Sequence, residues 1–332
     1  MIRTTVVGSW PLPEMYRDRL LQYHRGTLPD MLVKPTLSGA AEIAIREQKA
    51  TGVTQFMGGE FFAEVFINHI PRRLTGVRLI KQPADELKKY TDMAEYELTG
   101  EIEAPRGLGY VEAFRREVQL APDLEKASVP GPLEVVGHIR PTEAAQTQIA
   151  RAVEIVNREA RGLEAAGAKE IQLDIPYIAV SSVLGQLTPA QAVDLIAGSF
   201  AGVQVTKTIH CCLGDLGSQP VIPVHNLQAL LPYIQQLTGV VDKVHLECSH
   251  PGQWADRASL RDIPKGMQVI AGLVDVKTPV ETTEQMEERI REVLRFVEPD
   301  RLWIAPSCGF GRRTTDIATG KLSRIVEAAN RL

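Results

Sequence analysis

Eight short runs rich in valine, isoleucine and leucine recur along the chain, with amphipathic helical patterns between most of them. The runs are expected to be strands at Thr4–Ser9, Val53–Met57, Leu133–His138, Glu170–Asp174, Gln204–His210, Lys243–Glu247, Gln268–Val274 and Leu302–Pro306. The expected helices are Gly39–Lys49, Glu143–Ala166, Pro189–Phe200, Asn226–Gln236, Thr283–Phe296 and Lys321–Ala329. Near-continuous apolar strands that alternate with helices predict a parallel sheet covered on its outer face. Eight such units favour an α/β fold of the (β/α)8 TIM-barrel type over an open doubly wound sheet.

The stretch Glu60–Pro130 is too long for one crossover between the second and third strands. Alternating patterns at Thr99–Ala104 and Tyr110–Phe114 indicate an inserted hairpin or subdomain at about residues 61–130. A flexible linker would be richer in glycine, serine and proline than this stretch is. We therefore expect residues 1–332 to form a single TIM-barrel catalytic domain.

Bulk properties narrow the class of protein. A hydrophobic content of 44% and a charged content of 23% are those of a soluble globular protein. The net charge of -4 gives no reason to expect nucleic acid or an anionic membrane as a partner. No apolar run approaches the roughly 20 residues that span a bilayer, and the first residues lack a secretory signal pattern. Four cysteines in 332 residues do not make a disulfide framework. A cytoplasmic protein is expected.

Four residues with metal-binding side chains stand where apolar strands end: His210, Cys212, Glu247 and Cys308. The active site of a TIM barrel lies at the carboxyl ends of its strands, so we expect these side chains on the catalytic face. One nitrogen, two thiolates and one carboxylate satisfy tetrahedral Zn²⁺, and the soft sulfurs argue against Mg²⁺ or Ca²⁺. A carboxylate is also a ligand that an incoming substrate can displace. If these strand ends do not lie side by side, the cysteines are ordinary core residues.

Two further cysteines, Cys211 and Cys248, are neighbours of these ligands in sequence. Adjacent residues of a strand point to opposite faces, and a free cysteine usually behaves as a small buried hydrophobe. Both are expected in the core rather than on the metal.

Several motifs occur in order along nearly the whole chain. They are Val7-Gly8-Ser9-Trp10-Pro11, Gly59-Glu60, Gly131-Pro132, Ile171-Gln172-Leu173-Asp174, His210-x-Cys212, Glu247-Cys248-Ser249, Arg301-Leu302-Trp303 and Pro306-Ser307-Cys308-Gly309. With them the chain resembles the catalytic C-terminal half of cobalamin-independent methionine synthase, within a superfamily of barrel-fold methyl- and alkyltransferases. The resemblance implies zinc on His210, Cys212, Glu247 and Cys308. It also implies homocysteine held at its carboxylate by Val7 and Ser9 and at its ammonium by Glu60 and Asp174. Two carboxylates at strand ends need such a cationic partner when they are buried.

The chain departs from the family pattern in ways that concern the methyl donor. The full-length family enzyme is a pair of barrels, and this chain contains only the catalytic one. A tryptophan of the family's folate site is replaced by His138, and the family's Asp-x-His sequence is replaced by Asp275-Val276-Lys277. Methyl transfer from tetrahydrofolate needs a general acid, whereas a methylated corrinoid leaves without a proton. The expected donor is therefore a methylated corrinoid, or another donor that is not a polyglutamylated folate. The alternative is methyltetrahydrofolate, with the proton supplied by Lys277, His138 or His250.

The expected function is a zinc-dependent methyltransferase that converts L-homocysteine to L-methionine, with Lys277, His138 and Asp275 as catalytic candidates. A partner protein that supplies the methyl group fits a corrinoid donor. One rival is zinc-dependent alkylation of another thiol, such as coenzyme M. A second is a decarboxylase-like barrel that uses no metal, for which the arginines at 72, 73 and 140 are candidates. A third is a zinc-storing or partner-binding subunit, although an exchangeable carboxylate ligand argues against a purely structural zinc.

Overall fold

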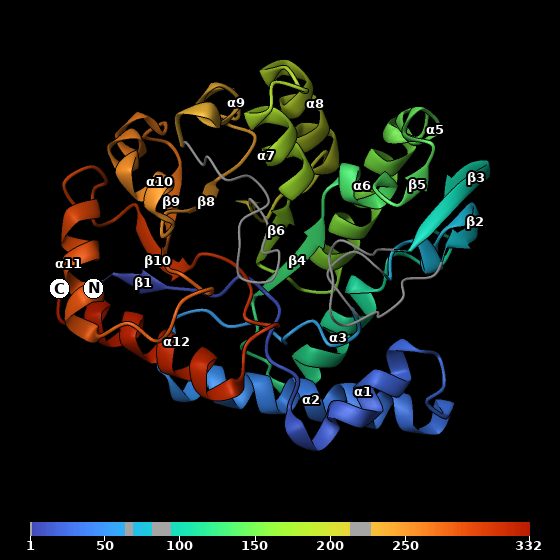
Figure 1. Cartoon of the computed structure of the whole chain (residues 1–332), viewed down its shortest axis with the longest axis horizontal. Helices are drawn as coiled ribbons and strands as arrows, with labels where there is room; N and C mark the ends of the chain where they lie inside the picture. The colour runs from blue at the N-terminus through green and yellow to red at the C-terminus, as the bar shows by residue number, and fades with distance from the viewer. Residues whose placement is uncertain (1, 64–68, 82–93, 213–226) are drawn as a thin grey trace.

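A computed structural model describes residues 2–63, 69–81, 94–212 and 227–332. Its main feature is a parallel sheet of seven strands in the order β1-β10-β9-β8-β7-β6-β4. The strands are β1 Arg3–Thr4, β4 Lys126–Pro130, β6 Glu170–Asp174, β7 Thr206–Cys211, β8 Lys243–Glu247, β9 Gln268–Val274 and β10 Leu302–Pro306. The sheet curls around a centre, with helices on its outer side (Figure 1). This confirms the α/β class with a curled parallel sheet.

The second expected strand, Val53–Met57, is represented by one isolated parallel bridge between Thr5 and Gln55. The backbone N–H of Gln55 donates to the carbonyl of Thr4 at 3.1 Å, so this segment runs beside β1. Among the described residues, the hydrogen-bonded sheet therefore has seven strands rather than a closed ring of eight.

The third expected strand, Leu133–His138, was wrong. Residues Pro132–Val136 form the short helix α4, which begins with proline at its first position. A short apolar run does not distinguish a strand from a buried helix, whereas a proline at the first helical position favours the helix. The actual strand is β4, inside the range expected for the insertion, and its polar Lys126 and Ser128 weaken its apolar signal.

The insertion contains the expected hairpin. Strands β2, Thr75–Lys81, and β3, Glu95–Glu103, are antiparallel, and β3 also pairs in parallel with the short β5, Ile139–Arg140. The second alternating pattern, Tyr110–Phe114, is not a strand but the first part of helix α3, Tyr110–Leu120. Residues 64–68 and 82–93 of the expected insertion lie outside the described residues.

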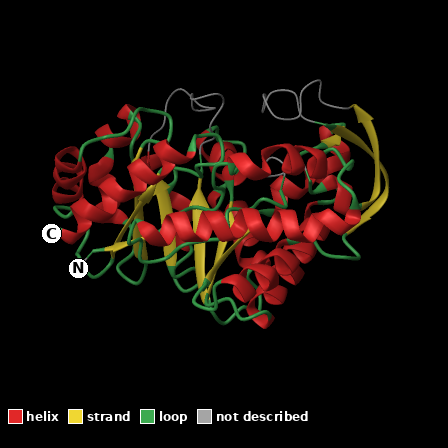
Figure 2. Ribbon diagram, turned by 90° about the horizontal axis from the view of Figure 1, so that it is seen from below, coloured by secondary structure: helices red, strands yellow, loops and turns green. Residues whose placement is uncertain are grey.

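The helices cover the outer side of the sheet and confirm most of the expected ones. They are α1 Arg17–His24, α2 Asp30–Ala50, α5 Thr142–Gln146, α6 Ile149–Ala165, α7 Pro176–Val183, α8 Pro189–Ser199, α9 Leu231–Gln236, α10 Pro251–Ala255, α11 Thr283–Val293 and α12 Thr315–Asn330. Short 3₁₀ turns occur at Glu14–Tyr16, Pro71–Arg73, Leu227–Ala229 and Arg257–Asp262. Asn226, the expected start of one helix, lies outside the described residues. Figure 2 shows the strands side by side behind a long helix. In the described part of the chain, no helix is both long and apolar enough to cross a membrane.

Candidate metal centre and substrate site

Two neighbouring loops at the carboxyl ends of the strands bring a histidine and two cysteines together. His210 lies near the end of β7, Cys212 follows that strand, and Cys308 follows β10. Their ligand atoms all lie within 4.8 Å of one another, and the two sulfurs are 3.5 Å apart. Three of the four expected ligands therefore meet on the catalytic face.

The chemistry of this cluster suits a divalent metal with a preference for nitrogen and sulfur. His210 is buried, and within the described part of the chain neither of its ring nitrogens has a hydrogen-bond partner. A hydrogen bond with Cys212 holds the pKa of Cys308 well below its ordinary value, helped by the charges of His210 and Lys277 and opposed by burial. A buried nitrogen that lacks a partner, next to an acidic thiol, matches the donor set of zinc sites.

Glu247, the fourth expected ligand, is not part of this cluster. It ends β8 and is buried, but its carboxylate lies outside the set of ligand atoms within 4.8 Å of one another. Its Oε2 is instead 3.9 Å from Nζ of Lys277. The described arrangement thus has three convergent ligands and a carboxylate at their side.

Lys277 lies on the loop after β9, where its backbone N–H donates to Oδ1 of Asp275 at 2.8 Å. Burial lowers the pKa of Lys277, but Glu247 and Cys308 raise it more, so the pKa is above its ordinary value. At neutral pH the Lys277 side chain is consequently an ammonium ion beside the candidate metal ligands. Asp275 shapes this loop through its carboxylate.

His138 lies elsewhere. Its Nδ1 is 2.9 Å from the carbonyl oxygen of Ala94, and its own carbonyl accepts a hydrogen bond from the backbone of Tyr96 in β3. Burial lowers its pKa. His138 does not end a third strand, as expected, because the residues before it form α4. It is instead hydrogen-bonded to Tyr96 of β3, in the three-stranded sheet β2-β3-β5.

Glu60, on a loop, and Asp174, at the end of β6, form a pair of partly buried and buried carboxyl groups. Ser128 donates a hydrogen bond to Glu60, and Nε2 of Gln172 donates to Asp174 at 2.7 Å. Burial raises the pKa of Glu60 to about 7. Burial also raises the pKa of Asp174 well above its ordinary value, and the charge of Glu60 adds to this. A cation placed between two such neighbouring acids favours the ionised form of both.

The backbone around Glu60 is arranged to bring its carboxylate inward. Gly59 has φ of 92° and Glu60 itself has φ of 61°, a left-handed conformation that is uncommon for residues other than glycine. A side chain at Gly8 would collide with the Glu60 carboxylate. The glycine of the Val7-Gly8-Ser9 segment is therefore required by the close approach of Glu60.

Val7 and Ser9 lie between the Glu60 loop and the Cys308 loop. The carbonyl of Val7 accepts a hydrogen bond from Gln172 at 2.9 Å, and the carbonyl of Ser9 accepts one from the backbone of Phe310 at 2.8 Å. A side chain at Gly309 would collide with the Ser9 hydroxyl. Ser9 thus lies next to the loop of Cys308, and Val7 is joined to Gln172 beside Asp174.

Three polar residues of the interior were not among the site residues expected from the sequence. The ring of His245 on β8 is 4.4 Å from that of His210, and its Nε2 is 3.0 Å from the carbonyl of Pro306. Lys126 donates to the carbonyl of Val6 at 2.7 Å. Tyr110 is buried, and its pKa is raised well above the ordinary value by burial and by Glu60 and Asp174. His245 was predictable, because strand alternation places it on the same face as Glu247.

Two arginines of the decarboxylase-like alternative, Arg72 and Arg140, are bound to backbone carbonyls rather than to residues of this site. Arg72 donates to the carbonyl of His24 at 2.6 Å, and Arg140 donates to the carbonyl of Gly137 at 2.9 Å.

Comparison with known proteins gives a consistent family. A family model described as the catalytic domain of cobalamin-independent synthase matches residues 2–331. A methionine synthase of Sulfolobus acidocaldarius is 23% identical, with 98% of this chain and 91% of that protein covered. One of Saccharolobus solfataricus is 24% identical, with 98% and 93% covered.

Solved structures show the same fold. A B12-independent methionine synthase from Shewanella sp. W3-18-1, in complex with selenomethionine, superposes with a TM-score of 0.82 at 20% identity, over 100% of this chain and 97% of that chain. A methyltransferase from Methanosarcina mazei has a TM-score of 0.62 at 12% identity, over 99% and 94%.

Proposed function

The chain belongs to the cobalamin-independent methionine synthase family, and from this we propose that it is a zinc-dependent methyltransferase that makes L-methionine from L-homocysteine. The observation that carries the proposal is the meeting of His210, Cys212 and Cys308 within 4.8 Å at the strand ends. Glu60 and Asp174 lie beside this cluster, with Cys308 close enough to raise the pKa of both. A thiol-activating centre next to an ammonium site fits an amino acid that carries a thiol.

His210, Cys212 and Cys308 would hold the zinc, with Glu247 as the fourth ligand. Zinc supplies Lewis acidity, which lowers the pKa of a substrate thiol so that it is a thiolate nucleophile at neutral pH. The protein's own groups orient the substrate. Glu60 and Asp174 bind its ammonium, and the Val7–Ser9 segment binds its carboxylate.

Homocysteine is favoured over coenzyme M by the charge of the site. A sulfonate is bound by cationic or backbone donors, whereas two carboxylates repel it and attract an ammonium. Binding of the substrate cation also relieves the repulsion that keeps Glu60 and Asp174 from ionising together.

The proposed donor is a methylated corrinoid, delivered by a partner protein. Lys277, which replaces the family's proton-donating histidine, has a raised pKa and gives up its proton reluctantly. His138 is bound to the carbonyl of Ala94, and burial lowers its pKa, which makes it a neutral imidazole. Neither is suited to protonate a tetrahydrofolate leaving group at neutral pH, whereas a corrinoid needs no such proton.

We also propose that the whole chain is one catalytic unit in which Val53–Met57 takes the eighth position of a barrel. The bridge between Thr5 and Gln55 and the hydrogen bond from Gln55 Nε2 to Glu170 at 3.0 Å support this placement.

The test is a methionine-formation assay on the zinc-loaded protein with three donors: methyltetrahydrofolate, methylcobalamin and a methylated corrinoid protein. Methionine should form with the corrinoid donors, and the purified protein should contain about one zinc per chain. Formation from methyltetrahydrofolate alone would overturn the donor. A metal-free protein with full activity would overturn the zinc mechanism.

A further inference from the structure

The pairing of Glu247 with Lys277 concerns the fourth metal position. Glu247 has the position in the chain expected of a zinc ligand, but its carboxylate is outside the His210–Cys212–Cys308 cluster and 3.9 Å from Nζ of Lys277. Both side chains are nearly inaccessible, at 2% and 7% exposure. At such burial an ion pair is weakly screened by solvent and salt. The Glu247 carboxylate therefore lies beside both the candidate metal position and the Lys277 ammonium.

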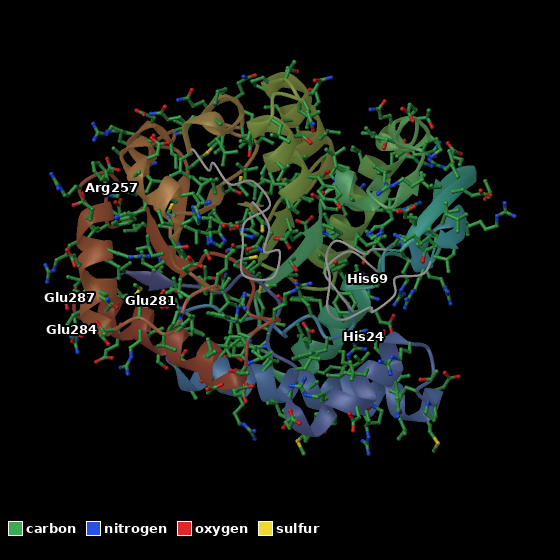
Figure 3. The ribbon with its side chains drawn as sticks, viewed as in Figure 1. His24, His69, Arg257, Glu281, Glu284 and Glu287 are labelled. Carbon is green, nitrogen blue, oxygen red and sulfur yellow. The ribbon has the colours of Figure 1, made fainter. Side chains whose placement is uncertain are left out.

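The loop that carries Lys277 is held in place from two sides. Lys321 on α12 is fully buried, and its Nζ donates to Glu281 Oε2 at 2.6 Å and to the carbonyl of Pro279 at 2.7 Å. Glu281, labelled in Figure 3, accepts in turn from the backbone of Asp275 at 3.3 Å. These contacts fix both ends of the segment from Asp275 to Glu281. Lys277 therefore extends from a segment whose ends are held by hydrogen bonds.

The same loop is bonded to the one that carries Cys308. The backbone N–H of Ser307 donates to the carbonyl of Val274 at 2.8 Å, and that of Val276 donates to the hydroxyl of Ser307 at 3.3 Å. Lys277 thus keeps its place relative to Cys308 and does not need to move in order to receive Glu247.

Charge explains why an ammonium belongs at this place. A divalent ion with two thiolates is neutral, and adding Glu247 makes the group anionic. A substrate thiolate that replaces Glu247 leaves the metal group equally anionic and frees a second negative charge inside a buried site. A buried charge needs a partner, and Lys277 is the ammonium within reach of Glu247.

We propose that Lys277 is a positioning residue that receives the Glu247 carboxylate when the homocysteine sulfur takes its place on the metal. This inference rests on the proposed function. With zinc held by His210, Cys212 and Cys308, the homocysteine sulfur would take the fourth position, the Glu247 carboxylate would give up that position to lie against Lys277, and the thiol proton would pass to solvent. Lys277 keeps its proton throughout. Its role differs from that of the general acid it replaces in the family pattern, because it accommodates the displaced ligand.

The experiment measures zinc coordination by X-ray absorption, with and without homocysteine, in the wild type and in Lys277→Met. In the wild type, homocysteine should add one sulfur neighbour and remove one oxygen neighbour. In Lys277→Met, the oxygen neighbour should stay. Lys277→Arg keeps the charge and should restore the exchange. Lys265→Met is the matched control, because Lys265 is exposed and lies 3.7 Å from Glu298; it should behave as the wild type.

Zinc affinity, measured by competition with a chelator, gives a second readout. Lys277→Met should bind zinc about tenfold more tightly, because the competitor for Glu247 is gone. In the Glu247→Gln background the same substitution should change the affinity much less. An exchange in Lys277→Met identical to that in the wild type would overturn the inference. A wild type that holds zinc but gains no sulfur neighbour would instead overturn the proposed function, and the inference with it.

Discussion

Replacing Glu60 by glutamine should stabilise the substrate-free protein and at the same time weaken homocysteine binding. Burial raises the pKa of Glu60 from 4.5 to about 7. Each pH unit of such a difference corresponds to about 1.4 kcal/mol, so ionising Glu60 in the folded protein costs about 3 kcal/mol. Glutamine keeps an oxygen that can accept the hydrogen bond from Ser128 but carries no charge.

Proton linkage determines how the unfolding free energy changes with pH. Between pH 4.5 and about pH 7, the unfolded chain has lost the Glu60 proton and the folded protein still holds it. The stability that this group contributes is therefore fully present below pH 4.5 and is lost as the pH rises through the folded value. The gain in unfolding free energy of Glu60→Gln over the wild type should be near zero at about pH 4.5 and reach about 3 kcal/mol above pH 7.

The assay is urea-induced unfolding of both proteins, equally loaded with zinc, at several pH values from about 5 to about 8. Glu42→Gln, a change at an exposed glutamate of α2, is the control and should show no pH-dependent gap. Glu60→Gln also removes a charged partner of the substrate ammonium, so its KM for homocysteine should be about 10- to 100-fold higher than that of the wild type. A stability gap that is the same at pH 5 and pH 8 would refute the reasoning.

Three further substitutions test the site and its support. Cys308→Ser should reduce bound zinc, measured by elemental analysis, from about one per chain to less than about a tenth, because it removes one of three convergent ligands; retention of a full equivalent would contradict the assignment. Cys248→Ala should keep the zinc and lower the unfolding free energy by about 1 kcal/mol, since Cys248 is fully buried in the core; loss of zinc there would place it in the metal site. Lys321→Met removes the fully buried ammonium that pairs with the mostly covered Glu281 carboxylate and should lower the unfolding free energy by about 3 kcal/mol in thermal or urea unfolding; a change below about 0.5 kcal/mol would show that the Lys321–Glu281 pair does not hold the loop.

The strands that the sequence predicted well are those buried on both faces. The strands at 170–174, 243–247, 268–274 and 302–306 have the bounds expected from their apolar runs. Such strands read as continuous hydrophobic segments. β4 was missed because Lys126 and Ser128 point into the polar interior of the curled sheet, where they bind Val6 and Glu60. The polar side chains that β4 contributes to the site thus interrupt the apolar pattern by which the strand could have been predicted.

The meeting of His210, Cys212 and Cys308 was predictable because parallel strands place their carboxyl ends at one edge. The contact of the Glu247 carboxylate with Lys277 was not predictable from the sequence. Which of two neighbours a carboxylate contacts depends on side-chain conformation and on Lys277, which comes from a different strand end. His138 was placed incorrectly because its position was inferred from a strand that is a helix. Residue spacing predicts which loops meet, whereas pairing among the meeting side chains depends on their three-dimensional arrangement.

The pairing of β1 with β10 has a consequence for the order in which the protein acquires activity during synthesis. Arg3 and Thr4 are in register with Trp303 and Ile304. The backbone groups of β1 that face β10 therefore find their hydrogen-bond partners only after the last strand has been synthesised. Ser9 and Cys308 come into proximity only at that moment. A ribosome-bound chain that lacks its last thirty or so residues therefore has neither a complete sheet nor a complete cluster of metal ligands. Contacts this distant along the chain also slow folding, so completion of the metal-ligand cluster is one of the late events in the folding of this protein.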